Sequence, residues 1–163
     1  MSKINIGDSK AYIREAEESV IRMLAKEGRK LIEKAWSTNE TTPRSYNMHD
    51  SYAYMIFHKG VLKEIGYLKD GTQSKGTHEG WVKYNYPDAT GRGYAAWVVA
   101  NYQPPRDGFQ LLIVSSVYYS SILEDGTQSP FGNKYKIISQ ITTDAEKFAS
   151  KHKGIKFKLI DIY

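Results

Sequence analysis

Apolar side chains recur with a helical period over the first part of the chain. Between residues 8 and 36 they fall at steps of three, four and seven, at Ile13, Ala16, Val20, Leu24, Leu31 and Ala35, with Met23 and Ile32 widening the stripe. This spacing places them on one face of an α-helix. Asp8 or Ser9 can cap its N-terminus, and the pair Glu18 and Arg22 lies on the opposite face. We therefore expect a long amphipathic helix over residues 8–36.

The expected helix is long for the size of the chain. Its length is roughly 43 Å at a rise of about 1.5 Å per residue. A compact chain of 163 residues has a radius of gyration of about 15 Å and a diameter of about 40 Å. The helix should therefore span or overhang its own domain, and the overhanging apolar residues need another surface. Two partners stay open, namely the chain's own C-terminal helix and a neighbouring subunit.

The rest of the pattern predicts a short second helix, several strands and another long helix. The aromatic-rich stretch Asn47–Phe57 is expected to be the second helix, and residues 134–152 the second main helix. Strands are expected over residues 63–69, 94–102, 109–117 and 155–163, with 109–117 as the central one. A turn at Asp107-Gly108 should precede that central strand. The prediction is a single α+β domain over residues 1–163, whose small antiparallel or mixed sheet carries the helices on one face.

Aromatic residues cluster where the chain is otherwise polar. Residues 72–92 are rich in Gly, Thr and Lys and predict a long loop or hairpin excursion. Loops of this length usually carry a function or an assembly contact. The chain has 13 tyrosines, a residue that suits partly hydrated interfaces. Half-buried sheet faces are the other explanation for this excess. The candidate subunit contacts are Trp81, Tyr84, Tyr86, Tyr118 and Tyr119.

A second turn is expected beyond the strand over residues 109–117. Asp125 and Gly126 should reverse the chain there, with Gly126 at positive φ, because glycine tolerates that conformation. The run from Asp125 to Ser129 repeats the run from Asp70 to Ser74. Two similar turns at strand ends explain the repeat, and a duplicated functional loop is the alternative.

The sequence contains no motif that brings together the acids, bases, nucleophiles or metal ligands of an enzyme active site. The chain has no cysteine, which excludes disulfides, thiolate metal sites and a cysteine nucleophile. Its four histidines show no metal-ligand spacing, and the adjacent residues His49, Asp50 and Ser51 cannot form a triad on a helix. We expect no catalytic residues, no metal and no cofactor. The sequence also shows neither a signal peptide nor a membrane span.

The net charge of +5 is concentrated near the C-terminus. Residues 134–163 hold seven basic and three acidic side chains, a net charge of +4, whereas residues 37–133 hold eight and nine. Lysines in this segment can contact phosphates or can form the solvated face of a helix and an edge strand. A basic nucleic-acid-binding protein is therefore the alternative function.

Two stretches resemble the tail-completion and minor tail-component proteins of tailed bacteriophages. Those proteins begin with a long charged helix, and a motif of the type T-G-N-L-R-x-S-I follows a polar loop; here Asn47, Met48 and Ser51 stand at the corresponding place. An apolar strand then runs into a pattern of the type Y-A-x-x-V-E-x-G-T, often followed by Pro-Phe. The segment from Tyr118 to Thr127, followed by Pro130-Phe131, is similar to it.

The resemblance implies a non-enzymatic structural protein of a phage virion, made in the cytoplasm of the bacterial host. Such proteins form a homo-oligomeric ring, here expected to have six or twelve subunits, at the head–tail joint or at the head-proximal end of the tail. Its partners would be other phage portal, connector or tail proteins, with genomic DNA passing through the channel. Subunits of a ring meet through two unlike patches. The overhanging helix and the aromatic loop around Trp81–Tyr86 are the candidates.

Overall fold

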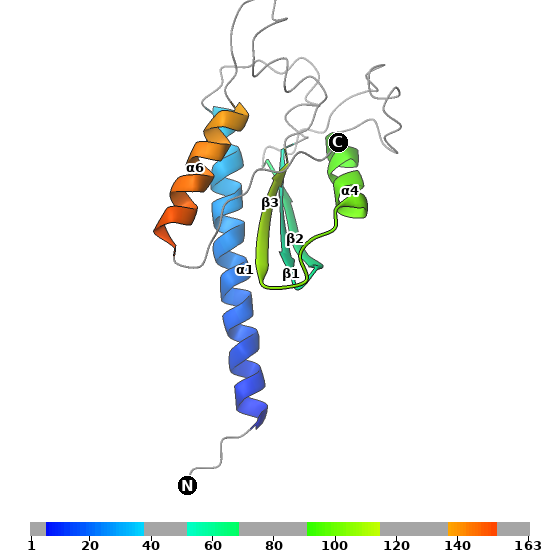
Figure 1. Ribbon diagram of the computed structural model, residues 1–163, viewed down its shortest axis with the longest axis vertical. Coiled ribbons are helices and arrows are strands. Elements are labelled where there is room, and N and C mark those ends of the chain that lie inside the picture. Colours follow the sequence, from blue (N-terminus) through cyan, green and yellow to red (C-terminus); the bar gives the residue numbers. More distant parts are fainter. Residues whose placement is uncertain (1–5, 38–51, 69–90, 115–136, 153–163) are drawn as a thin grey trace, which may run out of the picture.

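The computed structural model describes residues 6–37, 52–68, 91–114 and 137–152 (Figure 1). Along these residues the elements are α1 (Ile6–Ser37), β1 (Ala53–His58), β2 (Val61–Tyr67), α4 (Gly91–Asn101), β3 (Phe109–Val114) and α6 (Ile137–Lys151). Helices and an antiparallel sheet are thus combined in an α+β fold, as the sequence predicts. The long first helix and the second main helix are both confirmed, with α1 extending over 32 residues.

Within the described residues the sheet has three strands in the order β2-β1-β3. β1 pairs antiparallel with both neighbours, so that Met55 lies opposite Ile65 on one side and Leu112 on the other. All six residues of β1 are buried. This complete burial follows from the central place of β1 in the sheet together with cover on both sheet faces.

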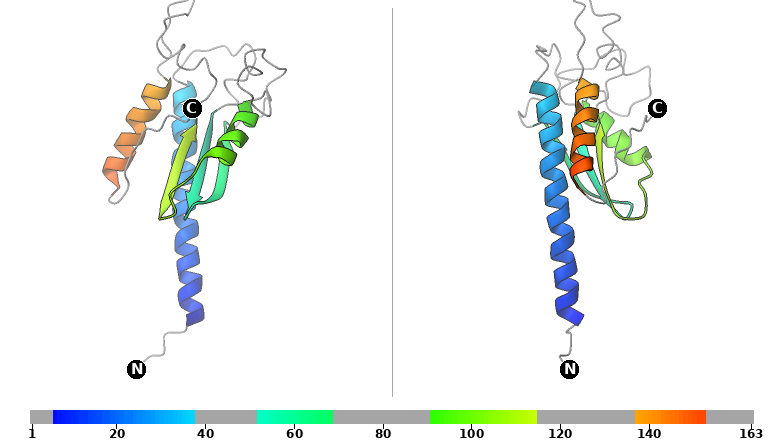
Figure 2. Two further views of the ribbon diagram at one scale, coloured as in Figure 1. Left: turned by 45° about the vertical axis from the view of Figure 1, so that its right-hand side comes forward. Right: turned by 60° about the vertical axis from the view of Figure 1, so that its left-hand side comes forward.

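Helices α1 and α4 lie on opposite faces of this sheet (Figure 2). Tyr54 of β1 contacts α1, because Arg29 of that helix donates a hydrogen bond to its hydroxyl. Phe57, whose side chain points to the other face, packs against Tyr102 just after α4 with ring centroids 5.7 Å apart. The prediction that the helices share one face is therefore wrong.

Helix α6 packs against the C-terminal part of α1 (Figure 1). An ion pair joins the two helices, with the Nζ of Lys34 2.7 Å from an Oδ2 of Asp144. Gln140 donates a second hydrogen bond to the same carboxylate oxygen. Of the two partners that the sequence left open for the long helix, its own C-terminal helix thus covers one end.

Two predicted elements have the wrong type. Residues 53–57, expected in a helix over Asn47–Phe57, form strand β1 instead. A segment buried on every side shows neither a period of two nor a period of 3.6. Residues 94–101, expected in a strand, belong to α4. Ala95 and Val98 are both completely buried, and their spacing of three is helical, although Trp and Val residues favour strands.

The other predicted strands and turns have mixed outcomes. The strand over residues 63–69 corresponds to β2, and the turn at Asp107-Gly108 is confirmed, with Gly108 at a φ of 63°. Residues 109–114 form strand β3, but β3 is hydrogen-bonded only to β1 among the described residues, so it is not the central strand. Four predicted parts lie outside the described residues: the start of the second helix, the loop up to residue 90, the end of the strand over residues 115–117 and the final strand over 155–163. Residues 91 and 92, expected in the loop over residues 72–92, belong to α4 instead.

Candidate functional site

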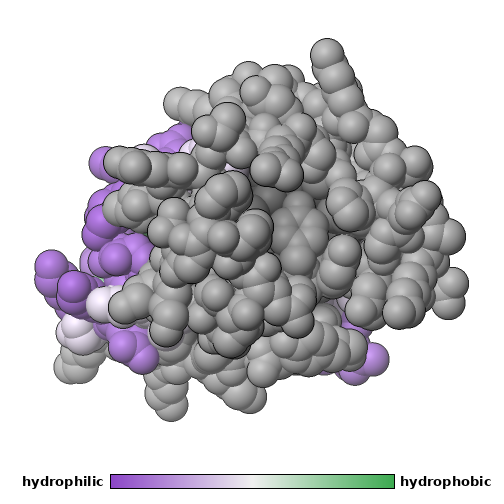
Figure 3. Space-filling view, turned by 90° about the horizontal axis from the view of Figure 1, so that it is seen from above, coloured by the Kyte–Doolittle hydropathy of each residue, from purple (hydrophilic) through white to green (hydrophobic). Residues whose placement is uncertain are grey.

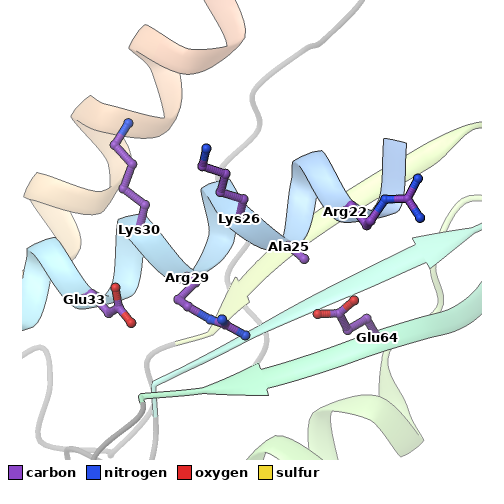
Figure 4. Close-up of a pocket in the computed structure, with 7 residues that line it drawn as sticks. All are labelled: Arg22, Ala25, Lys26, Arg29, Lys30, Glu33 and Glu64. Carbon is purple, nitrogen blue, oxygen red and sulfur yellow. The ribbon is translucent and has the colours of Figure 1, made fainter. Parts of the chain in front are cut away.

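An open groove lies along α1 on the side that faces the edge of β2 (Figure 4). Its volume is about 510 Å³. Six of the seven lining residues are charged: Arg22, Lys26, Arg29, Lys30 and Glu33 from α1, and Glu64 from β2, with Ala25 at the base. Four of these charges are positive and two are negative. We call this surface the basic groove.

Arg29 and Glu64 point toward one another across the groove (Figure 4). The hydroxyl of Tyr54 connects them. The Nη2 of Arg29 donates a hydrogen bond of 3.3 Å to the hydroxyl of Tyr54. That hydroxyl donates in turn to Oε1 of Glu64 at 2.9 Å. The chain of two hydrogen bonds joins α1, β1 and β2 and satisfies a hydroxyl group that is shielded from solvent.

The surroundings of Tyr54 favour its neutral form. Burial raises the pKa of the Tyr54 hydroxyl, and the hydrogen bond that it donates to Glu64 raises it further, while Arg29 opposes both effects. Tyr54 is completely buried. The hydroxyl is therefore held as a protonated donor and is out of reach of a substrate, so the network is suited to fastening the helix to the sheet.

Tyr54 fits between helix and sheet because two of its neighbours are glycines. A Cβ on Gly28 of α1 would lie 2.8 Å from Cγ of Tyr54, and a Cβ on Gly66 of β2 would lie 2.4 Å from Cε1. Both distances are far below van der Waals contact. The two glycines thus make room for the ring, which lets α1 approach the sheet closely.

A second polar cluster fixes α1 at the tip of the β1–β2 hairpin. Oε1 of Glu17 lies 3.7 Å from Nε2 of His58 and 3.6 Å from Nζ of Lys59. His58 is buried and its ring stacks on Phe109, with the ring centroids 4.0 Å apart and the planes 5° from parallel. Among the polar contacts described here between α1 and the sheet, those of Glu17 lie nearest the N-terminus of the helix.

Beyond Glu17, α1 projects past the end of the sheet (Figures 1 and 2). All residues from Lys10 to Ala16 are exposed. They include two large apolar side chains, Tyr12 and Ile13, which are 75% and 57% exposed. We call residues 6–16 the projecting segment. The sequence predicts that this helix spans or overhangs its domain, and in the described part of the chain it extends past the sheet.

Few of the described residues are visible from above (Figure 3). The view from above shows described residues at its margin that are coloured hydrophilic or neutral, with no apolar group among the described residues visible there (Figure 3). The exposed large apolar residues known for the described part of the chain are Tyr12, Ile13 and Met23 of α1 and Val61 of β2. Among the described residues, three of the four exposed large apolar side chains therefore lie on α1.

The candidate residues predicted from the sequence all lie outside the described residues. These are the proposed contact residues Trp81, Tyr84, Tyr86, Tyr118 and Tyr119, and the turn residues Asp125 and Gly126. Their roles remain predictions. Sequence reasoning in turn missed Arg29, Tyr54 and Glu64, which are brought together only by the tertiary fold. The spacing of Arg22, Lys26, Arg29 and Lys30 along one helix side was the available signal for the groove.

Two further features bear on function. Within the described ranges, no group of three His, Asp or Glu side chains is placed to hold a metal ion. None of the helices in those ranges has the length and apolar character to cross a membrane.

Comparisons with protein-family models, with curated proteins and with solved structures found no match to this chain.

Proposed function

We propose that this protein is a non-enzymatic structural subunit of a phage virion. It assembles as a ring of six or twelve copies at the head–tail joint or at the head-proximal end of the tail. Its other partners are the neighbouring portal, connector or tail proteins, and it is made in the cytoplasm of the bacterial host. The segments resembling phage tail-completion proteins, around Asn47 and from Tyr118 to Thr127, support this proposal.

The observation that carries the proposal is the projecting segment of α1. A helix that extends beyond its own sheet and exposes Tyr12 and Ile13 has surface that its described domain does not cover. Large apolar side chains exposed on a projection are candidates for contact with other proteins. A projection also makes the two ends of a subunit unlike, and a ring requires unlike patches because its contacts are head-to-tail.

Native mass spectrometry of the purified full-length protein tests the proposal. A concentration series is measured with and without duplex DNA. We expect closed species of six or twelve subunits whose population rises with protein concentration and does not change on addition of DNA. A monomer that binds DNA, with an affinity that falls steeply with salt, would instead favour a nucleic-acid-binding protein.

A further inference from the structure

The two halves of α1 carry opposite net charge. Residues 6–21 contain two basic and four acidic side chains, a net charge of −2. Residues 22–37 contain five basic and two acidic side chains, a net charge of +3. The acidic residues of the first half are concentrated in one turn, at Glu15, Glu17 and Glu18. A helix with such a division is complementary to a second copy of itself placed with its N-terminal half beside the C-terminal half.

The complementary charges lie on one side of the helix. Tyr12, Glu15, Arg22 and Lys26 follow one another at steps of three, seven and four residues, which places them on a common face. In the C-terminal half this face carries the basic groove, and in the N-terminal half it carries Tyr12 and Glu15. Glu15 and Lys26 are both exposed. Neither forms an ion pair with another residue in the described part of the chain.

The dimensions of the two surfaces also agree. The projecting segment, residues 6–16, is about 17 Å long at the helical rise per residue. The groove is lined on α1 from Arg22 to Glu33, a distance of about 17 Å. Ala25 and the aliphatic stems of Lys26 and Lys30 offer apolar contact to a large side chain such as Tyr12.

We propose that the N-terminal half of α1 of one copy docks on the basic groove of a second copy. Glu15 of the first copy then faces Lys26 of the second, and Tyr12 packs against the lysine stems. Glu18 and Arg22 keep the ion pair that they form with each other within one chain, at 3.9 Å. Two carboxylates, Glu33 and Glu64, also line the groove, which favours a protein surface of mixed charge over the uniformly negative phosphates of a nucleic acid. This contact rests on the proposed ring: with the two helices parallel and displaced along their axes it is head-to-tail, and it supplies the two unlike patches that such a ring requires.

Site-directed disulfide formation tests the contact, because the natural chain has no cysteine. The single variants Glu15→Cys and Lys26→Cys are mixed in equal amounts at high protein concentration and oxidised. The intact masses of the products distinguish mixed dimers from dimers of one variant. Within one chain the two positions are about 16 Å apart along the helix, beyond the reach of a disulfide, so each bond reports on two copies.

We expect the mixed dimer to exceed both same-variant dimers several-fold. A mixture of Glu15→Cys with Lys151→Cys, an exposed position on α6, is the matched control and should give only the background of random collisions. Reversing one charge, Glu15→Lys or Lys26→Glu, should abolish self-association of each variant alone. Mixing these two charge-reversed variants should restore association between unlike copies, because position 15 of either variant then faces an opposite charge at position 26 of the other. The double reversal in one chain should also restore it.

The outcomes separate this inference from the proposed function. Closed rings without the mixed disulfide would overturn the docking contact and leave the ring proposal standing. A mixed disulfide that yields only closed dimers from the double variant Glu15→Cys/Lys26→Cys would support the contact and contradict the ring. Neither rings nor a mixed disulfide at any concentration would contradict both. Saturation of the groove by duplex DNA, with loss of binding in Lys26→Glu, would also overturn the docking contact.

Discussion

The ring of Tyr54 occupies the space that a side chain at Gly28 would need. A Cβ at position 28 would lie 2.8 Å from Cγ and 2.9 Å from Cβ of Tyr54, and 3.0 Å from Cδ1 of Leu111. Glycine in the middle of a helix lowers its stability by about 1 kcal/mol relative to alanine. In this protein the glycine is needed despite that loss of helix stability, because only a residue without a Cβ lets α1 contact the sheet this closely.

Gly28→Ala should therefore destabilise the protein, although alanine is the better helix former. The clash with Tyr54 should cost about 1–3 kcal/mol and outweigh the gain in helix propensity. Urea unfolding followed by circular dichroism measures the difference. Ser19→Ala on the exposed side of the same helix is the control and should be neutral or slightly stabilising. A Gly28→Ala protein more stable than the natural one would show that α1 does not approach the sheet as closely as described.

Removing the hydroxyl of Tyr54 should weaken the attachment of α1 to the sheet. Tyr54→Phe leaves Glu64 without its donor and Arg29 without its acceptor. We expect a loss of about 1–2 kcal/mol in the free energy of unfolding. Tyr12 is an exposed tyrosine on α1, and Tyr12→Phe should change the free energy of unfolding by much less. Equal effects of the two substitutions would contradict the buried hydrogen-bond chain.

The raised pKa of Tyr54 predicts a loss of stability at alkaline pH. The unfolded chain releases the proton of a tyrosine near pH 10, whereas the folded protein retains that of Tyr54 at this pH. Stability should therefore fall as the pH rises above about 10, because the unfolded state then binds fewer protons than the folded state. The decline should be smaller in Tyr54→Phe, and unfolding curves between neutral and alkaline pH measure it.

The ion pair between α1 and α6 should make stability depend on acid pH. Burial disfavours the charged form of Asp144, but the hydrogen bonds from Lys34 and Gln140 and the charge of Lys34 outweigh it and lower the pKa of that carboxyl. The stabilisation is full above about pH 4, the pKa region of an unfolded aspartate, and is lost as the pH falls through the lower folded value.

Asp144→Asn measures that contribution. The variant should be less stable than the natural protein at neutral pH, by less than about 1 kcal/mol because Lys34 is half exposed. The difference should vanish in strong acid, where both proteins have a neutral side chain at position 144. Glu146→Gln, at an exposed position of the same helix, provides the comparison. A difference that persists unchanged in acid would show that the charge of Asp144 is not its source.

Ile13 and Ile32 allow the same substitution to be tested at two ends of one helix. Ile32 is completely buried, whereas Ile13 is 57% exposed. Ile32→Ala should lower the free energy of unfolding by about 2–5 kcal/mol. Ile13→Ala should leave the stability of the monomer nearly unchanged, which urea unfolding measures for both variants. A large loss of monomer stability in Ile13→Ala would show that the projecting segment is covered by its own chain.

The helices that bury one face and expose the other to solvent could be predicted from the sequence. In α1 and α6 the apolar residues recur at helical steps, from Val20 to Leu31 and from Ile141 to Phe148, because only one side of each contacts the core. In β1 that contrast is lost, since β1 is buried on both faces and hydrogen-bonded on both edges. A short apolar run without alternation is compatible with a helix or a strand, and the aromatic residues around Tyr54 did not decide between them.

The groove was beyond prediction for a different reason. Arg22, Lys26 and Lys30 could be placed on the polar side of α1, but Glu64 joins them from a strand more than 30 positions along the chain. The position of Glu64 depends on the register of β2 against β1 and on the packing of α1 against Tyr54. Sequence patterns reveal neither, because the pairing that determines them is tertiary. The projecting segment, in contrast, followed from the length of the helix alone.

The uninterrupted course of α1 gives the projecting segment a mechanical role. The helix is held to the sheet near Tyr54 and by Glu17 at the hairpin tip, and continues as one rigid rod to Ile6. A rotation of the rod by about 10° at the Glu17 hold would move its free end by about 3 Å over its length of about 17 Å. In the proposed ring, a force applied by a neighbouring subunit at that end would act with leverage on the hairpin, and strain in one subunit would be transmitted as a tilt of the next.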